Sequence, residues 1–269
     1  MSKRISDTFA RLKHSGKKVL SPYITAGDPY PEITVKMLHA LVDAGADIIE
    51  LGVPFSDPMA EGPVIQAAME RALRHGVGIS DVLAMVEDFR QSNQHTPIIL
   101  MGYVNPIEMM GYEAFAKQAS KAGVDGTIIV DLPPEEGEAL TAAWQAHDLD
   151  AIYLCSPTTS DERMDKINTL ASGYLYYVSL KGVTGSASLN VDEVSSAYQK
   201  RKSQISLPLL VGFGIKTAEN AAAIASFADG VVVGAGLVSR MAEEQADESR
   251  LLSYAPQLIA EMRAAIDSE

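Results

Sequence analysis

The chain has 269 residues, of which 47% are hydrophobic and 21% charged, and its formal net charge at pH 7 is −13. This is the composition of an ordinary globular protein. A net-acidic chain without a basic block is poorly suited to bind nucleic acid. It has no long apolar run, so neither a membrane span nor a membrane partner is expected. Residues 1–7 lack the apolar core of a secretory signal, which makes the cytoplasm the expected location.

Cysteine and histidine are too sparse for a disulfide framework or a metal cluster. Cys155 is the only cysteine, and the five histidines are scattered along the chain. No bound metal is therefore expected. An anionic substrate would have to be held by local hydrogen-bond donors, because the overall charge opposes its binding.

Short runs rich in β-branched and aromatic residues alternate along the chain with segments of helical periodicity. In those segments apolar residues recur at spacings of three and four, as on one face of a helix. The predicted strands are Val19–Thr25, Asp47–Val53, Pro97–Tyr103, Gly126–Asp131, Ala151–Ser156, Tyr174–Ser179, Pro208–Gly212 and Asp229–Val233.

Capping residues mark several of the expected helix ends. Ser80 is expected to cap the helix that follows it, and Gly45 to end the helix before it. Thr217 is expected to cap a later helix, and so is either Ser160 or Asp161.

Eight strand–helix units in a chain of this length predict a single (β/α)₈ barrel domain over residues 1–269. An extra helix, Asp7–His14, is predicted ahead of the first strand. A doubly wound open sheet is the alternative, but it needs a short or polar edge strand and none of the eight runs has that character. In a barrel the active site lies at the carboxyl ends of the strands, so the residues there are the functional candidates.

Glu50 interrupts the apolar strand Asp47–Val53. Strand residues alternate between faces, and Ile49 and Leu51 suit the face that packs against helices. Glu50 and Gly52 must then point into the barrel, with Gly52 leaving room above the carboxyl group. Burial raises the pKa of a carboxyl group toward neutrality, as general acid–base catalysis requires. The alternative is a structural salt bridge, which is disfavoured because no lysine or arginine lies in the strand cores.

The loop after this strand carries two further acidic residues, Asp57 and Glu61. Pro54 and Pro58 restrict its conformations, and loops on a rigid scaffold often carry function. From the residues alone, Glu61 is either a second catalytic carboxylate or a solvated loop charge. A solvated charge is the more usual outcome for an acidic loop residue, and the same holds for Asp57.

Glycines cluster after the last three predicted strands. Glycine lets backbone N–H groups approach a ligand closely, and the loops after strands seven and eight are the usual phosphate site of this fold. Three such clusters predict a phosphate site, with plain turn glycines as the alternative. The residues are Gly182 and Gly185, Gly212 and Gly214, and Gly234 and Gly236.

Several other residues near strand ends have two interpretations each. Asp131 either acts in the site or caps a turn or helix, and Lys181 is either a Schiff-base nucleophile or an ordinary loop lysine. A further set would form a pocket for a flat aromatic substrate or belong to the barrel core: Tyr23, Leu100, Ile128, Tyr176 and Phe213.

Five motifs give the chain a resemblance to a known family. The segments "YITAGDP", "IELGVPFSDPMAEGPVIQ", "GYVNPI", "YYVSLKGVTG" and "VGFGI", which follow one another along the chain, resemble the α subunit of tryptophan synthase. The resemblance implies a (β/α)₈ barrel that cleaves indole-3-glycerol phosphate to indole and glyceraldehyde 3-phosphate. It also implies that this chain has no cofactor. The implied partner is a β subunit that carries pyridoxal phosphate, and the two subunits are expected to form an α₂β₂ tetramer.

The resemblance also implies roles for individual residues. Glu50 matches the proton-transfer residue, and Glu61 the carboxylate that accepts the indole N–H. Tyr176 and Thr184 match residues that line the site, with Thr184 holding the loop carboxylate on closure. The remaining matches are phosphate contacts, namely Gly185, Phe213, Gly214 and Gly234, and residues that face or communicate with the β subunit, namely Asp57, Pro58 and Asp131.

Two positions depart from the family pattern. Glu61 stands where the family has Asp, and Ala235 stands beside the phosphate where Ser is common. These departures leave a second hypothesis open, a catalytically weakened α-like subunit that mainly binds and activates the β subunit. A Schiff-base aldolase that uses Lys181 is the third hypothesis.

Overall fold

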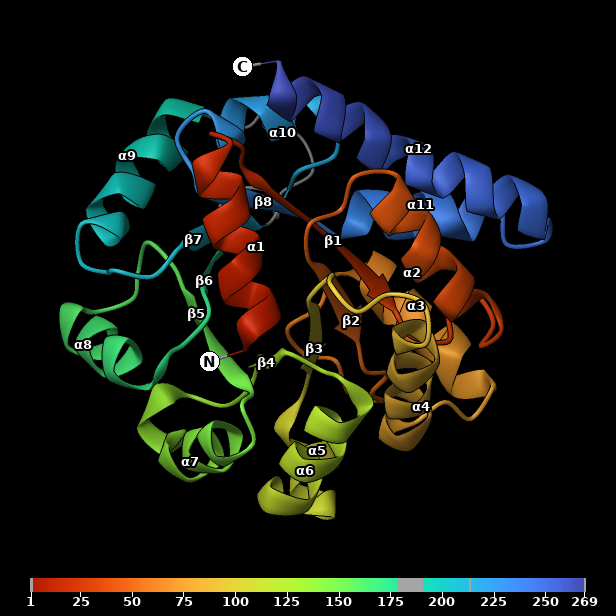
Figure 1. Cartoon of the computed structure of the whole chain (residues 1–269), viewed down its shortest axis with the longest axis horizontal. Coiled ribbons are helices and arrows are strands. Elements are labelled where there is room, and N and C mark those ends of the chain that lie inside the picture. Colours follow the sequence, from red (N-terminus) through yellow and green to blue (C-terminus); the bar gives the residue numbers. More distant parts are fainter. Residues whose placement is uncertain (1, 179–190, 213, 269) are drawn as a thin grey trace.

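The computed structural model describes residues 2–178, 191–212 and 214–268, and within them eight parallel strands close into a barrel (Figure 1). Each strand pairs with the next along the chain, and β8 pairs with β1, which confirms the predicted (β/α)₈ barrel. The strands are β1 Val19–Thr25, β2 Ile49–Gly52, β3 Ile98–Gly102, β4 Gly126–Ile129, β5 Asp150–Cys155, β6 Leu175–Val178, β7 Leu209–Gly212 and β8 Gly230–Val233.

Helices surround the barrel, and none of those in the described residues is long and apolar enough to cross a membrane (Figure 1). They are α1 Lys3–His14, α2 Ile33–Asp43, α3 Pro63–Arg74, α4 Ile79–Arg90, α5 Val104–Met110, α6 Tyr112–Ala122, the 3₁₀ turn η1 Pro134–Glu136, α7 Glu138–Ala146, α8 Asp161–Leu170, α9 Val191–Lys202, α10 Ala218–Ala225, α11 Ala235–Glu243 and α12 Glu248–Asp267.

The capping predictions are confirmed except at one helix. The Thr217 and Ser160 side chains accept hydrogen bonds from the backbone at the starts of α10 and α8. Gly45 follows α2 with a φ of 104°, a conformation that favours glycine. The prediction for Ser80 is wrong, since α4 begins before it: Gly78 occupies the cap position and donates its N–H to the Asp81 carboxylate.

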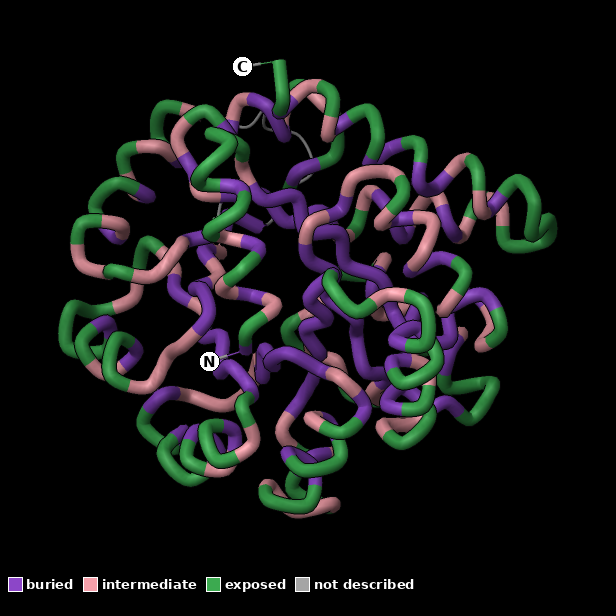
Figure 2. The backbone as a smooth tube through the Cα atoms, in the orientation of Figure 1, coloured by how far each residue is buried: buried purple, intermediate pink, exposed green. Residues whose placement is uncertain are grey.

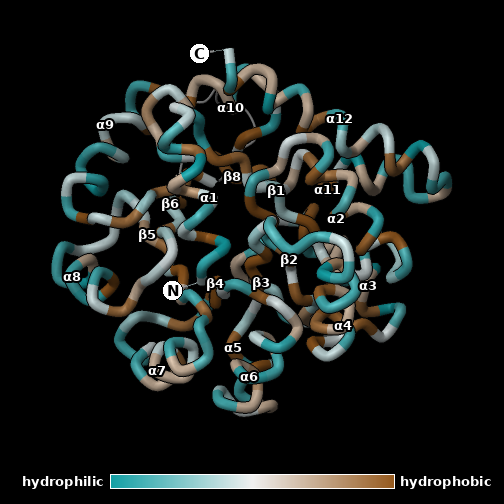
Figure 3. The backbone as a smooth tube through the Cα atoms, viewed as in Figure 1, coloured by the Kyte–Doolittle hydropathy of each residue, from teal (hydrophilic) through white to brown (hydrophobic). Residues whose placement is uncertain are grey.

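Two apolar layers hold the barrel together. One lies between the strands and the surrounding helices and includes Ile49 and Leu51, the other fills the barrel interior and includes Ile48 and Ile99. Figure 2 shows the buried strands at the centre and the exposed residues on the outer helix surfaces, and Figure 3 shows the matching hydropathy. The alternation predicted for the second strand is therefore confirmed.

α1 covers the amino-terminal end of the barrel (Figure 1). It begins at Lys3, four residues before the predicted start, and its residues Ile5, Phe9 and Leu12 pack into the interior layer. Because this end is closed by a helix, access to the barrel interior is left to the carboxyl end.

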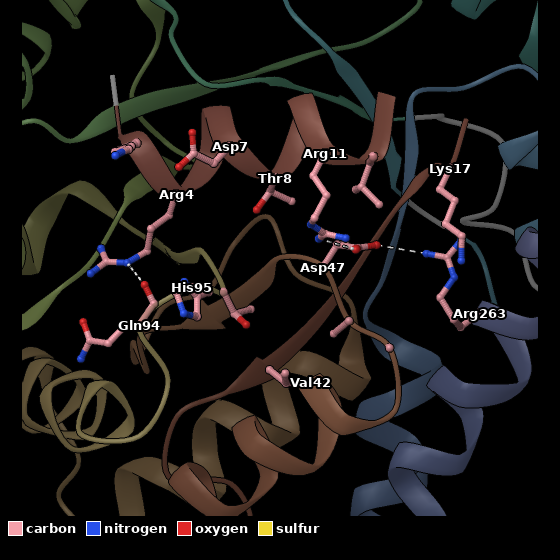
Figure 4. Close-up of a pocket in the computed structure, with 15 residues that line it drawn as sticks. Arg4, Asp7, Thr8, Arg11, Lys17, Val42, Asp47, Gln94, His95 and Arg263 are labelled. Atoms are coloured by element: carbon pink, nitrogen blue, oxygen red, sulfur yellow. Dashed lines mark hydrogen bonds and ion pairs between the residues drawn. The ribbon is translucent and has the colours of Figure 1, made fainter. Parts of the chain in front are cut away.

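A hollow of about 1010 Å³ lies beside α1 at the same end and is lined by charged residues (Figure 4). Asp47 joins its walls: its carboxylate accepts from Arg11 of α1 at 3.2 Å and from Arg263 of α12 at 3.0 Å. It also accepts the backbone N–H of Leu20 in β1 at 3.1 Å. These bonds tie the two terminal helices to the barrel, as expected of residues that stabilise this end of the fold.

Candidate active site

A cavity of about 320 Å³ opens at the carboxyl ends of the strands, opposite α1. Its described lining comes from both halves of the chain. It combines acidic residues of β2 and its loop with the glycine-rich turns after β7 and β8. The lining includes Tyr23, Glu50, Glu61, Ile65, Met101, Tyr176, Gly214, Ile215, Lys216, Val232, Gly234 and Ala235.

Glu50 lies on β2, points into the barrel and is fully buried. Its Oε1 accepts a hydrogen bond from the Tyr174 hydroxyl at 3.0 Å, whereas Oε2 has no hydrogen-bond partner among the described residues. Burial, with the nearby Glu61 carboxyl as a smaller cause, raises the pKa of Glu50 to about 8. A carboxyl group in this state can give or take a proton near neutral pH.

Tyr174 connects Glu50 to the amino-terminal end of the molecule. Its ring lies 6.0 Å from the ring of Phe9 in α1, measured between centroids, and the residue is fully buried. The phenol therefore has little freedom to move, and it fixes the orientation of the Glu50 carboxyl group by the hydrogen bond to Oε1.

Glu61 lies in the loop before α3 and is half-buried at the cavity wall. Its backbone N–H donates to the carbonyl of Pro58 at 3.0 Å, and the hydroxyl of Tyr103 accepts the N–H of Ala60 at 3.1 Å. Burial raises the pKa of Glu61 to about 7. The structure thus brings the two predicted catalytic carboxyl groups to one cavity. The loop that carries Glu61 is held in place by the two hydrogen bonds.

Two tyrosines form parts of the cavity wall in the same way. Tyr23 on β1 lies against Gly52 on β2, and Tyr176 on β6 lies against Gly212 on β7. A Cβ atom at either glycine would overlap the tyrosine ring. The room above Glu50 that Gly52 was expected to leave is therefore occupied by the ring of Tyr23, whose hydroxyl lies 3.1 Å from Oγ1 of Thr25.

The glycine-rich turns after β7 and β8 meet at the other end of the cavity. Gly214 has a φ of 80°, which glycine adopts without strain. Gly234 precedes α11, and Ala235 is its first residue, so the N–H groups at the start of the helix lie beside the cavity. First-turn N–H groups have no partner within their helix and bind anions well.

One prediction about the aromatic pocket is wrong. Leu100 pairs with Leu51 in the register of β3 and β2, and both belong to the layer under the helices. The next residue, Met101, pairs with Gly52 and lines the cavity in its place. Ile128 does point inward, but it is fully buried in the interior layer and does not line the cavity, which is the core interpretation.

The predicted partner-facing residues lie outside the cavity. Asp57 is exposed and Pro58 half-buried in the loop before α3. Asp131 accepts the N–H of Val104 at 2.8 Å, so its carboxylate caps the start of α5, one of its two interpretations. Five other candidates lie outside the described residues, namely Lys181, Gly182, Thr184, Gly185 and Phe213.

Met101, Ile65 and Lys216 line the cavity although the sequence did not single them out. Gly52 shares the inward face of β2 with Glu50, and Met101 pairs with Gly52 in the register of β2 and β3. Met101 could therefore be found only from that register, which a single sequence does not reveal. Lys216 lies in the same loop after the seventh strand as Gly214, so the argument that made these glycines candidates for the phosphate site also applies to it. Within the described ranges, no group of three or more His, Cys, Asp or Glu side chains could hold a metal ion.

Comparison with known proteins gives matches over the whole chain. The family model described as tryptophan synthase alpha chain matches residues 9–267. The tryptophan synthase alpha chain of Legionella pneumophila, strain Philadelphia 1, is 60% identical over 265 residues, which cover 98% of this chain and 97% of that one. The tryptophan synthase alpha chain of Marinobacter nauticus is 54% identical, with 98% of both chains covered.

Solved structures agree with these matches. The crystal structure of tryptophan synthase subunit alpha from Legionella pneumophila str. Paris has a TM-score of 0.95 at 57% identity and covers 100% of both chains. The tryptophan synthase of M. tuberculosis in its aminoacrylate-bound form has a TM-score of 0.87 at 33% identity, with 98% of this chain and 99% of that chain covered. Since the likeness extends over the barrel, its loops and its terminal helices, the chain belongs to the tryptophan synthase alpha chain family.

Proposed function

We propose that Glu50 and Glu61 act together in the reaction of this family, the cleavage of indole-3-glycerol phosphate to indole and glyceraldehyde 3-phosphate. The observation that carries the proposal is one cavity holding two carboxyl groups whose pKa values are raised to about 8 and about 7. The same cavity is lined by the glycine-rich turns after β7 and β8, which are suited to bind a phosphate.

The reaction is a retro-aldol cleavage and needs two proton transfers. The indole ring is protonated at C3, the hydroxyl on the adjacent side-chain carbon loses its proton, and the C–C bond between them breaks. The bonding electrons return to the ring, which leaves as indole, and the side chain leaves as an aldehyde. We assign proton transfer to Glu50, whose raised pKa places both protonation states within reach near neutral pH.

Glu61 is proposed to accept a hydrogen bond from the ring N–H. Positive charge develops on the ring as C3 is protonated, so a carboxylate at the N–H stabilises the transition state more than the bound substrate. The phosphate, held by N–H groups of the turns at Gly214 and Gly234, anchors the far end of the substrate and orients it.

The alpha chain family works without a cofactor of its own and has a β subunit as its partner, to which the pyridoxal phosphate belongs. We propose an α₂β₂ tetramer in the cytoplasm, where a phosphorylated biosynthetic intermediate is available. Asp57 and Pro58 are the residues of this chain proposed to face the β subunit, because both lie in the loop outside the cavity. Asp131, at the start of α5, is proposed to connect that surface with the site.

The test is the rate of indole release from indole-3-glycerol phosphate, measured with and without the β subunit. Glu50→Gln keeps the shape of the side chain and removes its proton chemistry, so we expect a loss of roughly 10²- to 10⁴-fold. Lys117→Gln, at an exposed position of α6, is the matched control and should leave the rate unchanged. A Glu50→Gln enzyme as fast as the parent would refute the role of Glu50.

A second candidate, an α-like subunit that is catalytically weakened and mainly activates β, is favoured by Glu61 and Ala235 at positions where the family has Asp and Ser. Glu61→Asp separates the two. The Glu61 carboxyl group already reaches the cavity wall, so shortening it by one methylene should lower indole release, on the order of tenfold. A large gain in rate would instead support the weakened subunit.

A further inference from the structure

The cavity has an unusual charge balance for a site that must hold a phosphate ester. Its described lining contains two carboxyl groups, Glu50 and Glu61, and a single basic side chain, Lys216. The chain as a whole carries a formal charge of −13. A dianionic substrate therefore approaches a net-negative molecule, and Lys216 is the one charge in the described lining that attracts it.

Lys216 lies at the phosphate end of the cavity. It follows the turn of Gly214 and Ile215, both of which line the cavity, and precedes α10. Its Cα would lie 3.5 Å from a Cβ atom built at Gly236, so its backbone packs against the first turn of α11. The lysine is thus attached beside the free N–H groups at the start of that helix.

The ammonium group of Lys216 is available for a ligand. The residue is exposed, and it makes no hydrogen bond or ion pair with any residue in the described ranges. Two other lysines at loop and helix ends are engaged by the fold: Lys18 donates to a backbone carbonyl at 2.8 Å, and Lys202 pairs with Asp229 at 2.7 Å. A lysine that lines the cavity and has no partner among the described residues is suited to pair with substrate.

The neighbouring residue gives a reason for this lysine. Ala235, the first residue of α11, has no hydroxyl to donate to a phosphate, where the family pattern commonly has a serine. We propose that Lys216 is a substrate-binding residue whose ammonium group pairs with the phosphate monoester, compensating in this chain for the hydroxyl missing at position 235. The proposal rests on the assignment of the phosphate to the turns after β7 and β8.

An ammonium contact differs from a hydroxyl contact in ways that can be measured. It acts at longer range, is screened by salt and favours a dianion over a neutral ligand. Phosphate binding by this chain should therefore weaken as ionic strength rises. The unphosphorylated analogue indole glycerol should gain nothing from the lysine.

The direct test is calorimetric titration with glycerol 3-phosphate as the probe, for the parent chain, Lys216→Gln and Lys216→Arg. Lys216→Gln should raise Kd roughly three- to tenfold, between the effects of an exposed ion pair and a charge-assisted hydrogen bond. It should also flatten the dependence of Kd on salt between about 0.05 and about 0.5 M. Lys216→Arg should restore both, and Lys117→Gln should match the parent.

Steady-state kinetics give the second readout. Lys216→Gln should raise KM for indole-3-glycerol phosphate by a similar factor with little change in kcat, because the contact is equally present in the bound substrate and the transition state. Ala235→Ser, added to Lys216→Gln, should recover part of the lost affinity for substrate. The same substitution in the parent chain should raise the affinity by a smaller factor. Equal Kd values and equal salt slopes for Lys216→Gln and the parent overturn the proposal.

The two proposals fail in different ways. If the parent chain releases no indole, the assignment of the lyase residues fails, whereas the titration with glycerol 3-phosphate still reports on Lys216. If indole is released normally but Lys216→Gln binds the probe as the parent does, only the role of Lys216 fails.

Discussion

Glu50 is a carboxyl group that the fold removes from water, gives one hydrogen bond from Tyr174 and leaves with one oxygen unpaired among the described residues. Such a group is stable only if it stays protonated to a higher pH than in the unfolded chain. The same desolvation that fits Glu50 for proton transfer therefore lowers the stability of the native state when the group ionises.

This cost predicts a pH-dependent gain in stability for Glu50→Gln. In the unfolded chain the group ionises near its ordinary pKa of 4.5, and in the native state near 8. Below pH 4.5 both states are protonated and the variant should match the parent. As pH rises toward 8 the parent alone loses stability, so the variant should gain on the order of 3 kcal/mol.

Urea denaturation at pH 5 and pH 8 measures the effect. Glu87→Gln, at an exposed position of α4, is the control and should change the free energy of unfolding by less than about 0.5 kcal/mol at both pH values. A stability gain for Glu50→Gln that is the same at the two pH values would contradict the assigned pKa.

Among the elements, two strand pairs of the cavity wall share the same packing, a tyrosine against a glycine. On β1 and β2, and again on β6 and β7, a tyrosine lies across a glycine two residues further along the neighbouring strand. Diagonal neighbours on one face of a sheet are within reach of an aromatic side chain. Because glycine has no side chain, the ring can pack directly against the neighbouring strand.

Gly52→Ala tests this packing. The added Cβ overlaps the ring of Tyr23, so we expect a loss of about 1–3 kcal/mol in the free energy of unfolding and a lower rate of indole release, because the displaced ring enters the cavity. Gly78→Ala, where the nearest atom lies at 3.8 Å, is the control and should cost less than about 1 kcal/mol. A fully stable and active Gly52→Ala enzyme would show that the ring moves away freely.

At the scale of the whole molecule, the two ends of the barrel have separate tasks. The carboxyl end holds the cavity, whereas the amino end is closed by α1 and by the ion pairs around Asp47 (Figure 4). Arg11, Arg263 and the N–H of Leu20 all bind this one carboxylate. Changes there should affect stability and leave the chemistry alone.

Asp47→Asn is the corresponding prediction. It removes the charge that holds the two arginines, so the free energy of unfolding should fall by about 2 kcal/mol, with an unchanged rate of indole release at 25 °C. Glu248→Gln removes one partner of the exposed pair with Lys36 and should leave the free energy of unfolding nearly unchanged, because solvent screens that pair. If Asp47→Asn lowered the rate of indole release and left the stability unchanged, the prediction would be wrong, and the two ends of the barrel would be coupled.

The order of the strands and helices, the barrel and the inward direction of Glu50 could all be predicted from the sequence. Those features depend on local periodicity and on a charge that marks one face of its strand. It did not determine which face of β3 is inward, because both faces of a parallel barrel strand are buried and the run around Leu100 and Met101 is apolar throughout. The folded structure was needed to find that register, the tyrosine–glycine contacts, and the approach of Glu61 and Lys216 to one cavity, since each depends on segments far apart in the chain.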